Sequence, residues 1–177
     1  MAHGHSHTHG DPVHQHRAAG KRTVRCLVVT VSDTRTIEDD KSGATASECL
    51  VTAGHEVRRR EIVKDDRDAI SGIVRSAIDD PDTDAVILTG GTGVAPRDVT
   101  YEAVAKMLEK PPDGFGELFR FLSWEEIGSA AMLSRAIGGI AGQTAVFALP
   151  GSTKAVRLGI GKLVGPELGH ILGLIAP

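Results

Sequence analysis

A glycine-rich loop followed by an acidic residue is the stretch of this sequence best suited to chemistry. The residues from Ala85 to Leu88 are all apolar, as in a buried strand, and Thr89-Gly90-Gly91-Thr92-Gly93 follows them. Asp98 then precedes a helix predicted at Thr100–Leu108. Because glycines let backbone N–H groups approach a ligand and a helix start adds unpaired donors, this arrangement suits a bound anion. It is not a P-loop, since no Gly-Lys pair follows the glycines, and Pro96 stands where a dinucleotide fingerprint needs its third glycine.

A second junction of the same kind lies later in the chain. The strand predicted at Thr144–Leu149 ends at Pro150-Gly151-Ser152-Thr153-Lys154. Small residues, hydroxyls and a cation at the end of a strand suit a phosphate group, as the first loop does. We therefore expect Pro150, Gly151, Ser152 and Lys154 to bind substrate.

Carboxylates stand at the ends of two further predicted strands. Ser32 and Asp33 follow the strand at Val24–Val31, and Asp65 and Asp66 follow the strand at Glu56–Val63. Open α/β folds place ligands at the carboxyl ends of their strands, which favours a functional role for these residues. For Asp33, loop capping is an equally good explanation, and for Asp65 or Asp66 helix capping is the commoner one.

Strands and helices alternate along the chain and must position these residues. Strands at Ala136–Ala141 and Thr144–Leu149 flank a turn at Gly142-Gln143, which predicts an antiparallel pair. The other apolar runs are typical of a parallel sheet covered by helices, with the charged strand Glu56–Val63 nearer an edge. Helices are predicted at Ala44–Ala53 with Ser42 as its N-cap, Asp68–Ile78, Thr100–Leu108, Phe115–Leu122, Met132–Arg135, Val156–Leu163 and Pro166–Ile175. We expect an α/β fold with a mostly parallel sheet and at least one antiparallel strand.

The composition excludes several classes of protein. The chain has 177 residues, 41% of them hydrophobic and 24% charged, which fits one globular domain. A net charge of −3 without a basic stripe argues against nucleic-acid binding. No apolar run looks long enough to span a membrane and no signal peptide precedes the first strand, so we expect no membrane contact and a cytoplasmic protein. Cys26 and Cys49 are then expected to be free thiols.

The residues before the first strand form a histidine-rich tail. Residues 1–23 contain His3, His5, His7 and His9 among small and polar residues, and nothing in them can pack into a core. We therefore expect residues 1–23 to be disordered and residues 24–177 to form a single domain. Such imidazoles can bind Zn, Ni or Cu weakly, but a tag remnant or a passive tail is the commoner explanation of a histidine-rich stretch.

Most of the aromatic side chains gather in one segment. Three of the four phenylalanines and the only tryptophan lie between Phe115 and Trp124. Packing into the core explains such a cluster, and a contact between protomers is the alternative, because aromatic residues are enriched at interfaces.

Five ordered motifs carry a resemblance to a known family over about Val24 to Pro166. They are Val31-Ser32-Asp33 with Asp40-Lys41-Ser42-Gly43, Thr89-Gly90-Gly91-Thr92-Gly93 with Arg97-Asp98-Val99-Thr100, Gly114-Phe115-Gly116-Glu117 with Arg120, Leu133-Ser134-Arg135-Ala136, and Leu149-Pro150-Gly151-Ser152 with Lys154. In this order they resemble the molybdenum cofactor biosynthesis B and molybdopterin adenylyltransferase family. The resemblance implies that residues 24–177 are one molybdopterin-binding domain, a three-layer α/β/α sandwich that usually assembles as a homotrimer or hexamer.

The resemblance also implies an activity. Members transfer AMP from MgATP to the terminal phosphate of molybdopterin and release pyrophosphate, and a metal-insertion enzyme receives the product. By motif, Asp65 and Asp98 would be the essential carboxylates, and they could also supply oxygen ligands to Mg²⁺. Ser32, Asp33, the loop Thr89–Gly93 and the second junction would bind the substrates. Two alternatives are a non-catalytic molybdopterin-binding paralogue or carrier, and a metal-handling protein that uses the histidine-rich tail.

Overall fold

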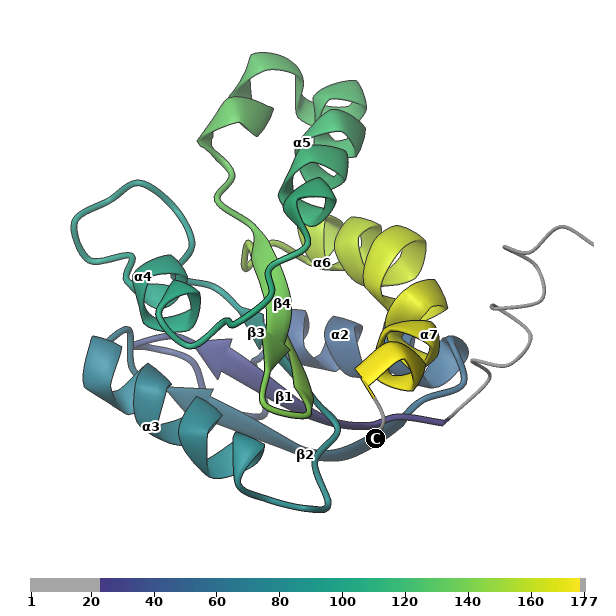
Figure 1. Cartoon of the computed structure of the whole chain (residues 1–177). Helices are drawn as coiled ribbons and strands as arrows, with labels where there is room; N and C mark the ends of the chain where they lie inside the picture. The colour runs from purple at the N-terminus through teal and green to yellow at the C-terminus, as the bar shows by residue number, and fades with distance from the viewer. Residues whose placement is uncertain (1–22, 176–177) are drawn as a thin grey trace, which may run out of the picture.

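A five-stranded sheet forms the centre of the molecule (Figure 1). The structure is a computed structural model that describes residues 23–175, so the histidine-rich tail, apart from Thr23, lies outside the described residues. The strands are β1 (Arg25–Val31), β2 (Glu56–Val63), β3 (Ala85–Thr89), β4 (Ile137–Ala141) and β5 (Thr144–Leu149), in the order β2-β1-β3-β5-β4. All neighbours pair in parallel except β4 and β5, which form an antiparallel hairpin around Gly142 with φ +61°. The predicted mixed sheet, with the charged strand β2 at an edge, is therefore confirmed.

Helices cover both faces of the sheet. They are α2 (Lys41–Thr52), α3 (Arg67–Ile78), α4 (Thr100–Ala105), α5 (Asp113–Ile127), the 3₁₀ helix η1 (Gly128–Leu133), α6 (Thr153–Gly159), the π-helical η2 (Ile160–Val164) and α7 (Gly165–Ile175). Successive residues of β3 point to opposite faces: Ile87 packs with the core under α2, α5, α6 and α7, while Val86 and Leu88 pack with α3 and α4. This confirms the expected three-layer α/β/α sandwich.

The start of α2 differs from the prediction. Asp40, not Ser42, is its N-cap, because the Oδ1 of Asp40 accepts a hydrogen bond from the backbone N–H of Gly43 at 2.8 Å. Ser42 is buried in the first turn, where its hydroxyl donates to the same Asp40 oxygen at 3.0 Å. Aspartate is as good an N-cap as serine, so a sequence that offers both leaves the choice to tertiary packing.

The C-terminal part of the chain is one helix rather than the two predicted. Residues Thr153–Ile175 run as a continuous helix of 23 residues with a mean hydropathy of 1.2 in its most apolar stretch. By length and composition it could cross a membrane, so the expectation that no such apolar run exists is wrong. Because the side chains of Val156, Ile160 and Leu168 are fully buried against the sheet, we attribute its apolar character to core packing.

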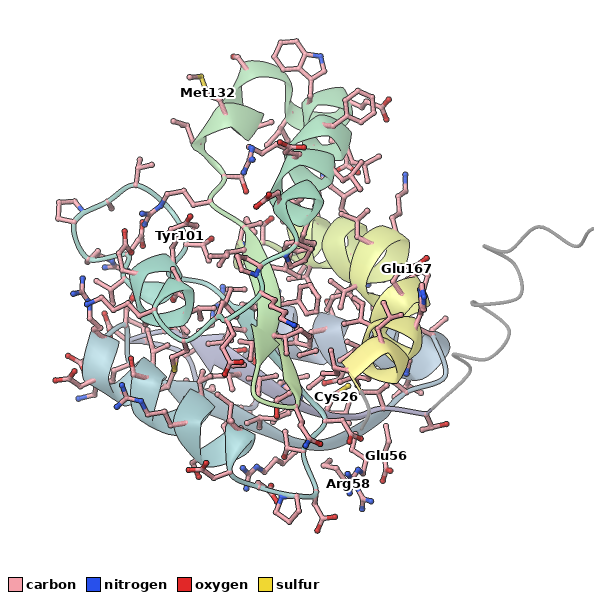
Figure 2. All side chains as sticks on the ribbon, viewed as in Figure 1. Cys26, Glu56, Arg58, Tyr101, Met132 and Glu167 are labelled. Carbon is pink, nitrogen blue, oxygen red and sulfur yellow. The ribbon has the colours of Figure 1, made fainter. Side chains whose placement is uncertain are left out.

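The aromatic segment lies on α5, which is longer than predicted and reaches Ile127. Phe115 and Phe119 are buried, and the Phe115 ring meets Phe147 of β5 edge-on with centroids 5.0 Å apart. Phe121 and Trp124, by contrast, are 64% and 60% exposed. Helix α5 and η1 stand out from the body of the molecule, with Met132 on the projecting end (Figures 1 and 2). Core packing therefore accounts for half of the aromatic cluster and leaves the other half in solvent.

Candidate functional site

The sheet brings the two predicted anion-binding junctions together. Strands β3 and β5 are parallel neighbours in which Thr89 pairs with Leu149, so the loops that follow them leave the sheet side by side. The Gly90 N–H donates to the Leu149 carbonyl at 3.0 Å. A Cβ on Gly151 would lie only 3.2 Å from the Gly90 Cα, so this close approach of two backbones favours glycine at position 151.

A cavity of about 440 Å³ opens between the two junctions. The glycine loop and Asp98 form one wall, and Pro150, Gly151 and Ser152 form another, as the sequence predicts. A third wall was not predicted as part of the site. It comes from α5, η1 and the start of α6 and consists of Phe119, Ser123, Ile127, Ala130, Leu133, Ser134 and Ala155. The cavity thus combines the glycine loop and a carboxylate with an apolar wall, a lining typical of sites that bind small molecules.

The loop glycines make room for two carboxylates. Gly91 has φ +62°, and a Cβ at this position would lie 2.8 Å from Oδ1 of Asp65. A Cβ on Gly93 would lie 2.5 Å from Oδ2 of Asp98. Each carboxylate therefore rests against a glycine Cα, so the glycines serve the acidic side chains as well as any bound anion.

Asp65 belongs to a group of three carboxylates at this edge of the sheet. Its N–H donates to Oδ1 of Asp33 at 3.1 Å, and its own Oδ1 accepts from the Val99 N–H at 3.3 Å. Burial raises the pKa of Asp65 above its ordinary value, and the nearby negative charges of Asp98 and Asp33 raise it further. Asp66, not Asp65, caps α3 by accepting from the Ala69 N–H at 2.9 Å. Asp65 is therefore free from capping and faces the glycine loop.

Asp65 and the remaining predicted site residues do not line the cavity. Thr89 is fully buried below the loop, where its hydroxyl lies 3.3 Å from that of Thr30 and 3.4 Å from that of Ser42. Ser32 and the exposed Asp33 stand at the end of β1, and neither lines the cavity. Lys154 faces a different depression, which it shares with Glu126, Arg157, Leu158 and Lys162.

Arg135 lies against the glycine loop, and the sequence did not single it out, although it lies within one of the quoted motifs. Its guanidinium donates to the Thr92, Gly93 and Asp98 carbonyl oxygens and pairs with Glu102. The ring of Tyr101 lies 5.1 Å from its Cζ. A motif can mark such a residue, but only the fold reveals that it contacts the backbone of the glycine loop.

Comparisons with known proteins identify the family of this chain. Residues 27–170 match the family model described as "Probable molybdopterin binding domain". The molybdenum cofactor biosynthesis protein B of Bacillus cereus is 54% identical over 160 residues, which cover 90% of this chain and 95% of that protein. The chain belongs to the molybdenum cofactor biosynthesis protein B family. Its role in molybdenum cofactor biosynthesis follows from that membership.

Solved structures of this family have the same fold. A crystal structure of a molybdenum cofactor biosynthesis protein B, 54% identical, superposes with a TM-score of 0.85 and covers 87% of this chain and 96% of that one. The tungsten cofactor synthesizing protein MoaB of Pyrococcus furiosus, 38% identical, gives a TM-score of 0.78 with coverage of 87% and 98%. The family assignment therefore rests on sequence and on fold together.

The described residues offer few ligands for a metal from the protein alone. Within residues 23–175, no three His, Cys, Asp or Glu side chains are grouped closely enough to hold a metal ion between them. One further oxygen lies near Asp65: the Thr100 hydroxyl is buried, has no hydrogen-bond partner, and points at the same side of Gly91 as the Asp65 carboxylate. A cation here would therefore need oxygen ligands from a bound substrate as well.

Proposed function

We propose that this protein adenylylates molybdopterin: it transfers AMP from MgATP to the terminal phosphate of molybdopterin and releases pyrophosphate. The observation that carries the proposal is the packing of two carboxylates, Asp65 and Asp98, against two glycines of one anion-binding loop. Both partners of the reaction are anionic, so their mutual repulsion is the main obstacle. A site that places N–H donors and metal-binding oxygens at one loop addresses that obstacle directly.

The residues around the loop fit a magnesium ion. Mg²⁺ prefers hard oxygen ligands and is usually bound by one or two carboxylates together with substrate phosphates. Asp65 and Asp98 supply the carboxylates, and the unpartnered Thr100 hydroxyl supplies a buried neutral oxygen beside Asp65. When bound, Mg²⁺ would neutralise phosphate charge and hold the reacting groups in place.

The chain's own residues would bind and orient both substrates. Because the Gly90 N–H already donates to the Leu149 carbonyl, the N–H groups of Gly91 to Gly93 would hold one phosphate. Ser152, with Pro150 and Gly151, would hold part of the second ligand across the cavity. The apolar wall that includes Phe119, Ile127 and Leu133 would cover the face of a ring and exclude water. Ser32, Asp33 and Lys154 would act at the margins of the site. No side-chain nucleophile is required, because one substrate phosphate attacks the other.

A pyrophosphate-release assay tests the proposal. Purified protein with molybdopterin and MgATP should release pyrophosphate and form adenylylated molybdopterin. The alternative, a non-catalytic molybdopterin-binding paralogue or carrier, predicts molybdopterin binding without turnover. Calorimetry distinguishes them, because an adenylyltransferase should bind ATP only in the presence of Mg²⁺, whereas a carrier should bind molybdopterin and show no magnesium-dependent ATP binding.

The same proposal extends to assembly and partners. We infer a homotrimer or hexamer, a cytoplasmic location, and delivery of the product to a metal-insertion enzyme. The exposed aromatic side chains on α5 are the candidate contact between protomers. The histidine-rich tail could add metal binding of its own, and deletion of residues 1–22 followed by measurement of Ni or Zn affinity tests that function separately.

A further inference from the structure

Arg135 binds the backbone of the glycine loop at several points. Its Nε donates to the carbonyl oxygens of Thr92 at 3.2 Å and Gly93 at 2.9 Å. Its Nη2 donates to the Gly93 carbonyl at 2.5 Å and to the Asp98 carbonyl at 3.2 Å. Three carbonyl groups of one loop thus converge on a single guanidinium, which is suited to this because its donors form a rigid planar fork.

The orientation of the guanidinium is itself fixed from two other sides. Nη1 pairs with Oε1 of Glu102, and Cζ lies 5.1 Å from the centre of the Tyr101 ring. Glu102 and Tyr101 belong to α4, the helix that follows the loop, so Arg135 joins the end of η1 to both the loop and its helix. The side chain therefore has little freedom to leave the loop.

Each carbonyl that Arg135 binds sets the direction of an N–H group. In a trans peptide the C=O and the following N–H point in opposite directions. Holding the Thr92 carbonyl toward Arg135 therefore turns the Gly93 N–H away from Arg135, and holding the Gly93 carbonyl does the same for the Val94 N–H.

The Asp98 carbonyl extends this effect to both carboxylates. The peptide that joins Asp98 to Val99 accepts from Arg135 through its oxygen and donates through its N–H to Oδ1 of Asp65 at 3.3 Å. One peptide plane thus links Arg135 to the backbone of Asp98 and to the side chain of Asp65. A displacement of Arg135 would shift both acidic residues together.

We propose that Arg135 is a positioning residue that sets the geometry of Asp65, Asp98 and the loop N–H groups for ligand binding. It does so through the backbone and does not touch the reacting atoms. This inference rests on the proposed function for the identity of the ligand, but the geometric claim requires only that the two carboxylates bind a divalent cation.

Arg25 is a matched control at the other end of the sheet. It binds Asp84 at 2.9 Å, Asp82 at 2.6 Å and the Pro81 carbonyl at 2.8 Å. These contacts lie where β1 and β3 begin, whereas the cavity lies beyond the end of β3. Its side chain is 26% exposed, against 27% for Arg135. Both arginines join several backbone and acidic groups, so their removal should cost comparable stability, and only Arg135 should affect the site.

The experiment measures Mn²⁺ binding by electron paramagnetic resonance, with and without ATP, in the full-length wild type, Arg135→Gln, Arg135→Lys and Arg25→Gln. We expect Arg135→Gln to bind Mn²⁺ roughly 10- to 100-fold more weakly, as for other residues that orient metal ligands. Arg25→Gln should stay within about twofold of wild type, although its melting temperature falls similarly. Arg135→Lys should lie between, because lysine keeps the charge and loses the fork.

Wild-type affinity in a folded Arg135→Gln variant would overturn the inference. If Arg135→Gln does not fold, Arg135→Lys decides in the same way, and an affinity equal to that of wild type would reject the positioning role. If wild type binds Mn²⁺ but forms no adenylylated product, the proposed function fails while the comparison of the two arginines still stands. If wild type binds no Mn²⁺ with or without ATP, the positioning role fails with it.

Discussion

Two aspartates near the loop, one buried and one half-buried, have pKa values shifted in opposite directions. Asp40 is almost fully buried, yet hydrogen bonds and the charge of Arg60 favour its ionised form. Asp65 is held beside other carboxylates with a raised pKa, so its ionised form costs free energy in the absence of a cation. Asp40 is therefore suited to stabilising the fold. Ionisation of Asp65 is unfavourable without a cation, so only Asp65 fits a ligand-binding group.

Asp98 is the first residue whose role can be tested. Asp98→Asn should lower the rate of pyrophosphate release by at least about 100-fold, because the amide loses the negative charge that binds Mg²⁺. The fold should persist, since the Asn side-chain oxygen can still accept from the Ala95 N–H, as Asp98 does at 3.1 Å. Asp66→Asn is the control: it retains a helix cap and should leave the rate unchanged. Unchanged turnover in Asp98→Asn would remove Asp98 from the mechanism.

Asp40 should contribute stability that depends on pH. Burial alone would raise its pKa, but hydrogen bonds from the Gly43 N–H, Thr30, Arg60 and Ser42 hold the pKa below its ordinary value. A carboxyl with a lowered folded pKa stabilises the fold above its unfolded pKa, and this contribution disappears as the pH falls through the folded pKa. Asp40→Asn should therefore cost about 3 kcal/mol at neutral pH, because it leaves the Arg60 charge without its partner.

Chemical denaturation at neutral and strongly acidic pH measures this effect. The difference in unfolding free energy between wild type and Asp40→Asn should shrink in acid, where the wild-type carboxyl is protonated. Asp39→Asn, at the exposed neighbouring position, should change stability by no more than about 0.5 kcal/mol. A difference between wild type and Asp40→Asn that is the same at both pH values would contradict the electrostatic account of Asp40.

At the scale of elements, the glycine loop and helix α3 provide a matched pair of glycines. Gly91→Ala places a Cβ 2.8 Å from Oδ1 of Asp65 at a backbone φ of +62°, so the carboxylate must move. We expect magnesium-dependent ATP binding to weaken at least about tenfold and stability to fall by about 1–2 kcal/mol. Gly72→Ala in α3 meets no atom within 4 Å and should stabilise the protein by about 0.5–1 kcal/mol without affecting binding. Calorimetry with MgATP and thermal unfolding measure both effects, and unchanged ATP binding in Gly91→Ala would contradict the role given to the glycine.

The elements that the sequence predicts well are those with a local signal. Strands β2 and β5 are predicted at their observed bounds, and β1, β3 and β4 to within one residue, because apolar runs and turn residues report on the strand itself. The junctions after β3 and β5 could be placed together only through the general rule that ligands bind at the carboxyl ends of parallel strands. Two walls of the cavity were therefore predictable from the sequence.

The rest of the site depends on long-range packing. The α5–η1 wall has no sequence signature of ligand binding, because its apolar residues cannot be distinguished in the sequence from residues of the hydrophobic core. Lys154 was grouped with Ser152 by sequence proximity, but it lies in helix α6, where residues three and four apart share a face. It therefore faces the depression that Arg157 and Leu158 line, three and four positions later. Arg135 reaches a loop about 40 positions earlier in the chain, and no local pattern carries that information.

At the scale of the whole molecule, α5 and η1 project from the body, and one side of α5 exposes apolar residues to solvent. Leu118, Phe121 and Trp124 are spaced three apart along α5, so they share one side of the helix, and all three are more than half exposed. The opposite side of α5 carries Phe119 and Ser123, which line the cavity. A protomer docked on the exposed side would therefore hold in place the helix that forms the third wall of the site.

This arrangement predicts the effect of removing the exposed aromatic residues. Light scattering should give the wild type a mass of three or six times the chain mass of 18.6 kDa, and Phe121→Ser combined with Trp124→Ser should reduce it to one chain. The single variant Val51→Ser alters an equally exposed apolar residue on α2 and should leave the assembly intact. Because these substitutions do not touch the cavity, the dissociated variant should still bind molybdopterin, but more weakly, since α5 loses its outer support. A wild-type mass of one chain, or an assembled double variant, would show that α5 does not form the contact.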